Sequence, residues 1–298
     1  MAVALTLVPS GGVPITPIAS GAAPYTVVQS GGIAATVVAS GGRPVTLLTP
    51  TDTVYDTDTI ALLGTMSVQP TATRAGLIDA LIAGLKTDGI WSLLDLFYVQ
   101  AAHDSQAARL NWINPATYTC LEVASPTFTT DQGYAGNGTT SYLNTQYTPS
   151  TNAVNLAQNS ATIAVWSRTA AVDKFVFGNG TSTGIIAIGT RLTGDFFSYR
   201  MNQSTTTATA STDGSGLFAA SRSGASATQG YRNGATLGAA GSAASAALPA
   251  QALNIGRVAA GFSGVQVAAA AVGANLSGAQ HLALYTRLNT YMTAIGAA

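Results

Sequence analysis

The chain has 298 residues, of which 47% are hydrophobic and only 8% are charged, and its 12 lysines and arginines balance its 12 aspartates and glutamates. A typical soluble domain has about 25% charged residues. Nucleic acid and anionic membranes need a basic surface, so neither is an expected partner of this chain. With so little self-repulsion to keep it in solution, the protein is expected to occupy a fixed place in an assembly.

Neither insertion into a membrane nor secretion is expected from this sequence. The longest apolar stretch, about residues 265–272, is much shorter than the roughly 20 residues that cross a bilayer. No Lys or Arg precedes Arg43, so the N-terminus lacks the basic start of a secretory signal. Cys120 is the only cysteine, which excludes an intrachain disulfide and fits folding in a reducing cytoplasm.

The first fifty residues repeat every ten positions. The repeat places threonine and glycine in fixed columns, at Thr6, Thr16, Thr26, Thr36 and Thr46 and at Gly11, Gly21, Gly31 and Gly41. Apolar residues alternate around each threonine as in a strand, and Ser-Gly-Gly then provides a turn. Such short strands need partners, so residues 1–50 are predicted to be a β-segment for attachment and oligomerisation. A flexible linker is the alternative.

Residues 51–89 are interpreted as a connector. Its first part, to about residue 69, is rich in Thr and Asp and is expected to carry one or two further strands. A helix is predicted over residues 71–86, because Thr71 can cap it and apolar residues follow at helical spacing. Residues 90–99 then read as a buried strand, and residues 101–110 as a short helix.

Residues 90–298 are predicted to form a β-sandwich or jelly roll. Short strands recur at intervals of about 8 to 15 residues, and Asn179-Gly180 and Asn233-Gly234 are suited to hairpin turns. A last helix is expected between Ser277, as its cap, and Gly296, as its stop. The fold class is therefore mainly β, with an N-terminal decapeptide β-repeat and one or two accessory helices.

Several phrases of this region resemble the concanavalin A-like, or laminin G-like, jelly-roll superfamily. They are residues 134–138 with 141–143, residues 230–234, residues 253–257 and the closing stretch from residue 276 to 285. The resemblance is greatest to versions carried on virion proteins of tailed phages and prophages, where such a sandwich follows a repetitive N-terminal segment. It implies a two-sheet domain of 12 to 14 strands and, for many relatives, binding of cell-surface glycans.

The sequence predicts that the chain is not an enzyme. Glycoside hydrolysis by the usual route needs two carboxyl groups about 5 to 9.5 Å apart. The chain has one glutamate, Glu122, and lacks the E-x-D-x-x-E strand motif of glucanases with this fold. The two histidines, His103 and His281, show no spacing typical of a catalytic triad and are expected to be structural.

Sugar binding would use aromatic rings that stack on pyranose faces and planar polar groups that bond hydroxyls. The candidates by residue type and turn position are Tyr134, Trp166, Tyr199, Tyr231 and Asn233. A structural role is the favoured alternative for each of them: Trp166 lies in an alternating strand and would then be a core residue, and Asn233 would serve only its turn. No cofactor is expected apart from a candidate Ca²⁺, for which Asp131 and Asn137 supply suitable oxygens.

The function predicted from these features is that of a structural protein of a phage or phage-like virion, such as a spike, fibre or decoration protein. Its expected partners are other capsid or tail proteins and further copies of itself, bound through the repeat, and a host-surface glycan, bound through the jelly roll. The expected location is the virion surface after assembly in the host cytoplasm. A polysaccharide-degrading enzyme of the same fold and a secreted adhesin are the alternatives.

Overall fold

The computed structural model describes residues 18–19, 26–28, 38–39, 46–48, 55–180 and 184–298. Two compact units are distinguished, residues 1–54 and 55–298. The described strands of the first unit are β1 (Ile18–Ala19), β2 (Thr26–Val28), β3 (Val38–Ala39) and β4 (Thr46–Leu48).

These strands form two parallel pairs whose partners are two repeats apart. Ile18 pairs with Val38 in β1 and β3, and Thr26 pairs with Thr46 in β2 and β4, so both offsets are 20 residues. Alternate repeats are therefore the pairing partners among the described residues. The other repeat positions predicted to act in assembly lie outside the described residues: Thr6, Thr16, Thr36, Gly11, Gly21, Gly31 and Gly41.

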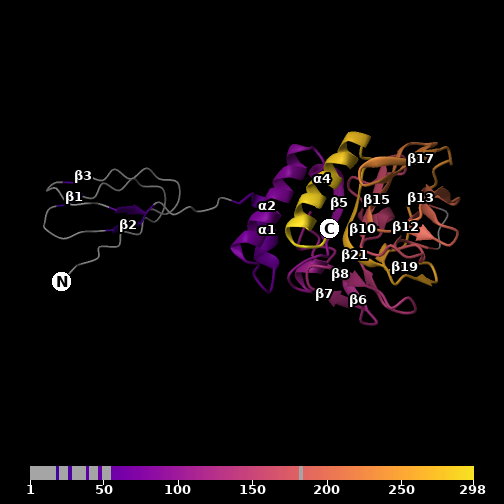
Figure 1. Cartoon of the computed structure of the whole chain (residues 1–298). Coiled ribbons are helices and arrows are strands. Elements are labelled where there is room, and N and C mark those ends of the chain that lie inside the picture. Colours follow the sequence, from indigo (N-terminus) through magenta and orange to yellow (C-terminus); the bar gives the residue numbers. More distant parts are fainter. Residues whose placement is uncertain (1–17, 20–25, 29–37, 40–45, 49–54, 181–183) are drawn as a thin grey trace. The chain divides into compact units, whose positions relative to one another are not determined.

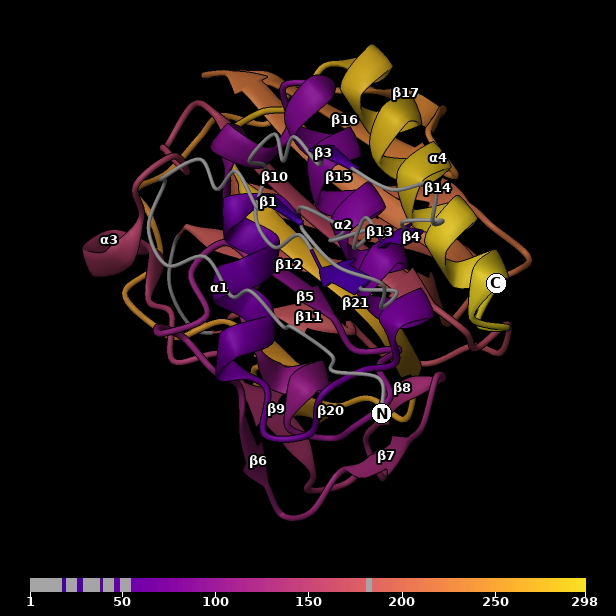
Figure 2. The same cartoon turned by 90° about the vertical axis from the view of Figure 1, so that its left-hand side faces the viewer.

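The second unit is built in three layers. Helices cover one face of a large antiparallel sheet, and a second antiparallel sheet packs against the other face (Figures 1 and 2). The first sheet has the order β17-β16-β15-β10-β21-β8-β7, with β5 also paired to β21, and the second has the order β14-β13-β12-β11-β18-β9-β6. The prediction of a mainly β, two-sheet jelly roll is confirmed.

Strands of the first sheet are β5 (Leu94–Val99), β7 (Thr127–Thr129), β8 (Gly133–Ala135), β10 (Ala161–Ser167), β15 (Gly216–Gly224), β16 (Ala227–Arg232), β17 (Ala235–Gly241) and β21 (Gln266–Gly273). Strands of the second sheet are β6 (Leu121–Val123), β9 (Tyr142–Asn144), β11 (Phe177–Gly178), β12 (Ile185–Leu192), β13 (Phe196–Gln203), β14 (Thr207–Ala210) and β18 (Asn254–Ile255). A small hairpin joins β19 (Arg257–Val258) to β20 (Gly261–Phe262).

The helices follow local capping chemistry. Helix α2 (Ala72–Thr87) begins after Thr71, whose hydroxyl accepts the Arg74 N–H, and α4 (Gly278–Ala294) begins with a reciprocal capping box between Ser277 and Gln280. Both were predicted. The prediction of a strand is wrong for α1 (Thr57–Thr65), because the Asp56 side chain accepts the Asp58 N–H and starts a helix there.

Other short elements are α3 (Pro149–Asn152) and the 3₁₀ helices η1 (Trp91–Leu93) and η2 (Ala107–Arg109). The short helix predicted for residues 101–110 is confined to η2. The three long helices share one hydrophobic core with the sheets, into which Leu62 of α1, Ile82 of α2 and Leu288 of α4 are almost completely buried. We infer that the helices are an integral layer of this unit, since they seal the outer face of the first sheet.

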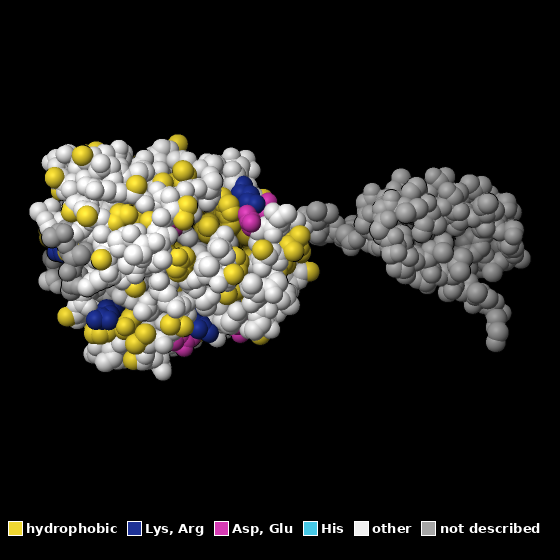
Figure 3. Space-filling view, turned by 180° about the vertical axis from the view of Figure 1, so that it is seen from behind, with side chains coloured by type: hydrophobic (Ala, Val, Ile, Leu, Met, Phe, Trp, Pro, Cys, Tyr) yellow, Lys and Arg dark blue, Asp and Glu magenta, His cyan; other side chains and the backbone are white. Residues whose placement is uncertain are grey.

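The surface of this unit reflects the low charge of the sequence. Charged side chains are sparse and scattered among uncharged atoms on the face that Figure 3 shows. No helix among the described residues is long and apolar enough to cross a membrane.

Candidate functional site

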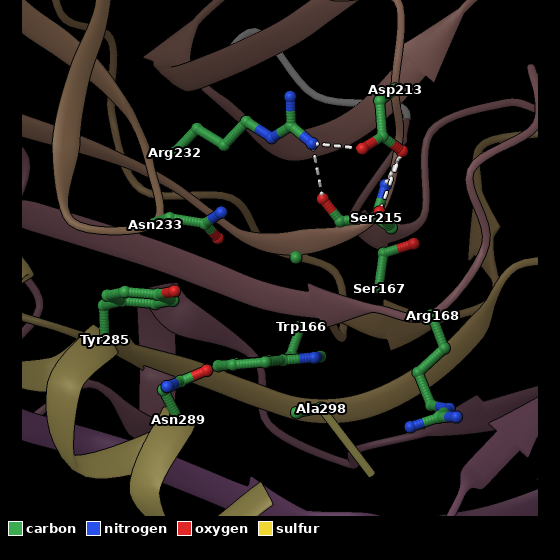
Figure 4. Close-up of a pocket in the computed structure, with 11 residues that line it drawn as sticks. Trp166, Ser167, Arg168, Asp213, Ser215, Arg232, Asn233, Tyr285, Asn289 and Ala298 are labelled. Carbon is green, nitrogen blue, oxygen red and sulfur yellow. Dashed lines mark hydrogen bonds and ion pairs between the residues drawn. The ribbon is translucent and has the colours of Figure 1, made fainter. Parts of the chain in front are cut away.

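The first candidate site is a pocket of about 300 Å³ between the first sheet and α4 (Figure 4). Five segments contribute: the end of β10, the turn before β15, the β16–β17 turn, α4 and the C-terminal Ala298. The residues that supply its aromatic and polar groups are Trp166, Asp213, Ser215, Arg232, Asn233, Tyr285 and Asn289. Two of the five residues predicted from sequence to bind sugar, Trp166 and Asn233, are thus brought together here.

Two aromatic rings form one wall of the pocket. Trp166 of β10 and Tyr285 of α4 stack with a centroid distance of 5.9 Å and an interplanar angle of 14°. The pairing of β10 with β21 shifts register between Trp166 and Ser167, so the strand ends just after the indole. Trp166 is 4% exposed and Tyr285 is partly exposed, so the tyrosine offers the larger accessible ring.

An ion pair lies opposite these rings. Arg232 at the end of β16 donates to Asp213 Oδ2 at 2.6 Å and to the Ser215 carbonyl at 3.0 Å, and its guanidinium lies 5.1 Å from the Phe218 ring centroid. The Ser215 N–H and hydroxyl also bond to the Asp213 carboxylate, at 2.9 and 2.8 Å. These hydrogen bonds, the backbone one above all, lower the pKa of Asp213 and keep it ionised.

The turn between β16 and β17 positions an amide over the pocket. Asn233 and Gly234 have φ values of 48° and 80°, as the Asn-Gly sequence predicted. The Asn233 side-chain oxygen accepts the Leu217 N–H at 2.9 Å, which fixes the orientation of the amide. Gly216 has φ +102°, and a Cβ there would lie 2.5 Å from the Asn233 oxygen, so this close approach requires glycine.

Several polar groups of the pocket have no hydrogen-bond partner among the described residues. They are the Asn233 Nδ2, both polar atoms of the Asn289 amide, the Tyr285 hydroxyl and the Trp166 indole N–H. Stacked aromatic rings beside free amide and hydroxyl groups provide an apolar surface with both donors and acceptors next to it. Polyhydroxylated rings have the complementary chemistry, with apolar C–H faces and a polar edge.

The remaining three sugar-binding candidates lie elsewhere. Tyr134 is 3% exposed, and its hydroxyl bonds to Glu122 Oε1 at 2.5 Å and to the Ser105 carbonyl at 3.2 Å. Tyr199 is 1% exposed and packs beside Phe197 inside the sandwich. Tyr231 is 7% exposed and stacks on His281 at 3.9 Å. We therefore leave these three rings out of the candidate site.

The two residues predicted to hold Ca²⁺ each bind another part of the protein. Asp131 forms an ion pair with Arg74 at 2.7 Å. Asn137 Oδ1 accepts three successive backbone N–H groups, from Thr139, Thr140 and Ser141, and so stabilises its own turn. Among the described residues, no three His, Cys, Asp or Glu side chains are grouped as a metal site would need. Metal binding at these residues stays a prediction.

A serine and a histidine do meet inside the domain. Ser221 Oγ lies 2.7 Å from His281 Nε2 and 2.6 Å from Thr162 Oγ1, and Thr162 Oγ1 also accepts the Leu276 N–H. His281 is 1% exposed, its Nδ1 has no partner among the described residues, and burial lowers its pKa to about 3. Without an acidic partner on Nδ1 this is not a triad, and the network instead joins α4 to the sheet.

No protein-family profile matches the sequence, and no curated protein matches it. Some solved structures are similar at low identity. A sialidase from Trypanosoma rangeli is 12% identical over 74% of this chain and 40% of its own, with a TM-score of 0.48. The chain thus spans about two fifths of the sialidase chain.

Two further structures are isolated domains. Domain 4 of an extracellular GH43 arabinanase from Geobacillus stearothermophilus, solved with arabinotriose, is 13% identical over 64% of this chain and 98% of its own, with a TM-score of 0.44. The binding domain of botulinum neurotoxin serotype D is 8% identical over 66% of this chain and 52% of its own, with a TM-score of 0.45. At these identities the likeness concerns the fold.

The comparison corrects the prediction that the chain is not an enzyme, since the similar structures include sialidases and a domain of an arabinanase. The sequence-based reasoning was too narrow for a physical reason. A missing strand motif excludes only one way of arranging catalytic groups, whereas folding can join residues from separate segments. Glu122 illustrates this, because the structure places it beside Tyr134 and 3.4 Å from Arg109.

Proposed function

We propose that the chain binds a saccharide in the pocket between β10 and α4. The observation that carries the proposal is the stacked pair of Trp166 and Tyr285, which has the Asn289 amide beside it on α4 and the free Asn233 Nδ2 group in the same pocket (Figure 4). Saccharide sites combine an aromatic platform with a few fixed planar polar groups, and this pocket holds both. The ion pair of Arg232 with Asp213 keeps the opposite wall in place.

A glycan array tests this proposal. The full chain, fluorescently labelled, should be retained by a restricted set of glycans. Tyr285→Leu removes the accessible ring but keeps an apolar side chain against Trp166, and it should lower retention at least tenfold. Leu282→Ala, at an exposed position of the same helix, is the matched control and should bind as the wild type does. If no glycan retains the chain, or if Tyr285→Leu is retained as strongly as the wild type, saccharide binding at this pocket is contradicted.

Cleavage of a glycosidic bond is a second candidate function, favoured by the contact between Tyr134 and Glu122. The buried Tyr134 hydroxyl donates to Glu122 Oε1 at 2.5 Å and so orients the carboxyl group, which can then act as a general acid or base. The Glu122 side chain is 37% exposed and so can be approached from solvent. The test is incubation of the chain with the glycans that bind it on the array. Hydrolysis predicts that the wild type produces new reducing ends and that Glu122→Gln does not. If the wild type produces no new reducing ends, hydrolysis is ruled out.

We also propose that the decapeptide repeat attaches the domain to a larger assembly, for which a virion surface stays our prediction. The support is the parallel pairing of Thr26 with Thr46 and of Ile18 with Val38. Because each strand pairs with the strand two repeats away, every further pair of repeats can add one strand to each of the two sheets. A chain that begins at residue 55 should remain folded but lose assembly, as measured by light scattering of the full and shortened chains. Equal particle masses would contradict the attachment role.

A further inference from the structure

A second pocket, of about 260 Å³, lies where β5 begins, between residues 111–118 and residues 147–155. Its inner end is built on Asp95, which is 8% exposed. The Asp95 carboxylate accepts the Tyr147 hydroxyl at 2.6 Å and the backbone N–H groups of Asn155 and Leu156 at 2.8 and 3.0 Å. These fixed donors compensate the charge of the carboxylate, so the polar groups of the pocket that stay free to bind a ligand are uncharged.

An aromatic ring is presented to this pocket from a strained position. Tyr118 has φ +58°, a left-handed conformation that costs a non-glycine residue energy. Its ring meets the buried Tyr147 ring edge-on, at 5.4 Å and 89°. The Tyr118 carbonyl accepts the Tyr98 hydroxyl at 2.6 Å, so the backbone is anchored in this conformation. The half-buried Tyr118 side chain is left beside the pocket, and its hydroxyl has no partner among the described residues.

Three asparagines around the pocket each bind the protein through one end of the amide and leave the other end free. Asn114 Oδ1 accepts the Ala116 N–H at 3.2 Å, and Asn152 Oδ1 accepts the Thr148 N–H at 2.8 Å. Both Nδ2 groups therefore remain as donors. Asn155 is reversed: its Nδ2 donates to the Leu94 carbonyl at 3.1 Å, and its Oδ1 remains as an acceptor.

We propose that this pocket is a second saccharide site and that it takes an uncharged sugar. A fixed aromatic ring, two amide donors and one amide acceptor match hydroxyl groups on a sugar that also has an apolar face. Val154 at the rim is 86% exposed and extends the apolar contact. No arginine or lysine lines the pocket to bind a carboxylate or sulfate group, which is the reason for expecting a neutral ring.

The strand register separates the two pockets. Trp166 is level with Ala269 of β21 and Val99 of β5, whereas Leu94 at the second pocket is level with Gly273 and Thr162. From Thr162 to Trp166 the strand advances about 13 Å, and β10 and β5 are two strand spacings, about 10 Å, apart. The pockets therefore lie at opposite ends of the sheet and bind separate rings. This inference rests on the proposed function in one respect only, namely that the ligand of the chain is a saccharide.

Side-chain amide resonances in NMR spectra of the full chain report on both pockets independently. The probes are D-glucose, D-galactose, D-mannose, L-rhamnose and N-acetyl-D-glucosamine, each titrated to 50 mM. We expect at least one of them to shift the amide signals of Asn114 and Asn152 in a saturable way. Asn114→Asp and Asn152→Asp keep the oxygen that accepts the backbone N–H and replace the free NH₂ donor by a charged acceptor oxygen, so each should weaken this binding at least threefold without unfolding the domain.

Asn289→Ala, in the first pocket, is the matched control and should leave the titration of Asn114 and Asn152 unchanged. A second site is contradicted if none of the five sugars shifts these signals, or if Asn289→Ala abolishes their shifts. Shifts at Asn114 and Asn152 without shifts at Asn233 and Asn289 would support the second site and count against the first. Shifts only at Asn233 and Asn289 would support the proposed function and overturn the present inference.

Discussion

Acid should destabilise the domain through one buried histidine. His281 lies in the first turn of α4, is 1% exposed, and packs against Tyr231 on one side and Ser221 on the other. Its contacts with Ser221 of β15 and Tyr231 of β16 are with uncharged groups, and the nearby N-terminus of α4 disfavours a positive charge. Burial therefore lowers the pKa of His281 to about 3, below the value of about 6.5 expected in the unfolded chain.

The sign and size of the effect follow from this difference. Above about pH 6.5 the ring is neutral in both states, and His281 adds no pH dependence. As the pH falls below 6.5 the unfolded chain binds a proton that the folded chain excludes, so the free energy of unfolding drops by about 1.4 kcal/mol per pH unit until about pH 3. Between pH 7 and 4.5 this single group should cost about 3 kcal/mol.

Denaturant unfolding at pH 7.0, 6.0, 5.0 and 4.5 measures this cost. The variant His281→Gln keeps a polar group within reach of Ser221 and cannot titrate, so its stability should fall by about 3 kcal/mol less than that of the wild type over this range. Leu282→Ala, at the exposed neighbouring position, should keep the wild-type pH dependence. If His281→Gln and the wild type lose stability in parallel, the histidine is not held neutral by the fold.

Three further outcomes are expected. Arg222→Met should lower the free energy of unfolding by about 3 kcal/mol in denaturant titrations, because the fully buried guanidinium donates to the Met201, Gly224 and Ala243 carbonyls, which the variant leaves unpaired. Gly133→Ala should unfold at a markedly lower temperature in calorimetry, because its Cβ would lie 2.0 Å from the Val267 carbonyl oxygen. Asn289→Ala should weaken glycan binding about fivefold in titration calorimetry, with no loss of thermal stability, since alanine is the better helix former.

The elements that were predicted correctly are those whose signals are local. Thr71 and Ser277 cap their helices through residues three positions away, and Asn233-Gly234 defines a turn by itself. Helix α1 was missed because Thr and Asp in its first turn are also typical of turns. Its position depends on a distant contact, since Lys86 of α2 forms ion pairs with Asp56 and Asp58.

The candidate site could be predicted only in part, because residue type does not reveal burial. Trp166 and Tyr199 were equivalent candidates by sequence, yet one ends its strand beside α4 and the other is enclosed between the sheets. Tyr285 and Asn289 lie one turn apart on the last helix, and neither was among the residues predicted from sequence to bind sugar. The asparagines of the second pocket also escaped prediction, since Asn114 and Asn152 meet only after folding joins two separate loops.

A crystal structure of the full chain, soaked with a glycan that binds the chain on the array, is the most direct measurement of saccharide binding by this fold. Binding at the first pocket predicts a sugar ring within about 4 Å of the Tyr285 ring, with hydroxyl groups bonded to Asn233 or Asn289. A sugar bound elsewhere, with this pocket occupied only by solvent, would contradict the proposed function.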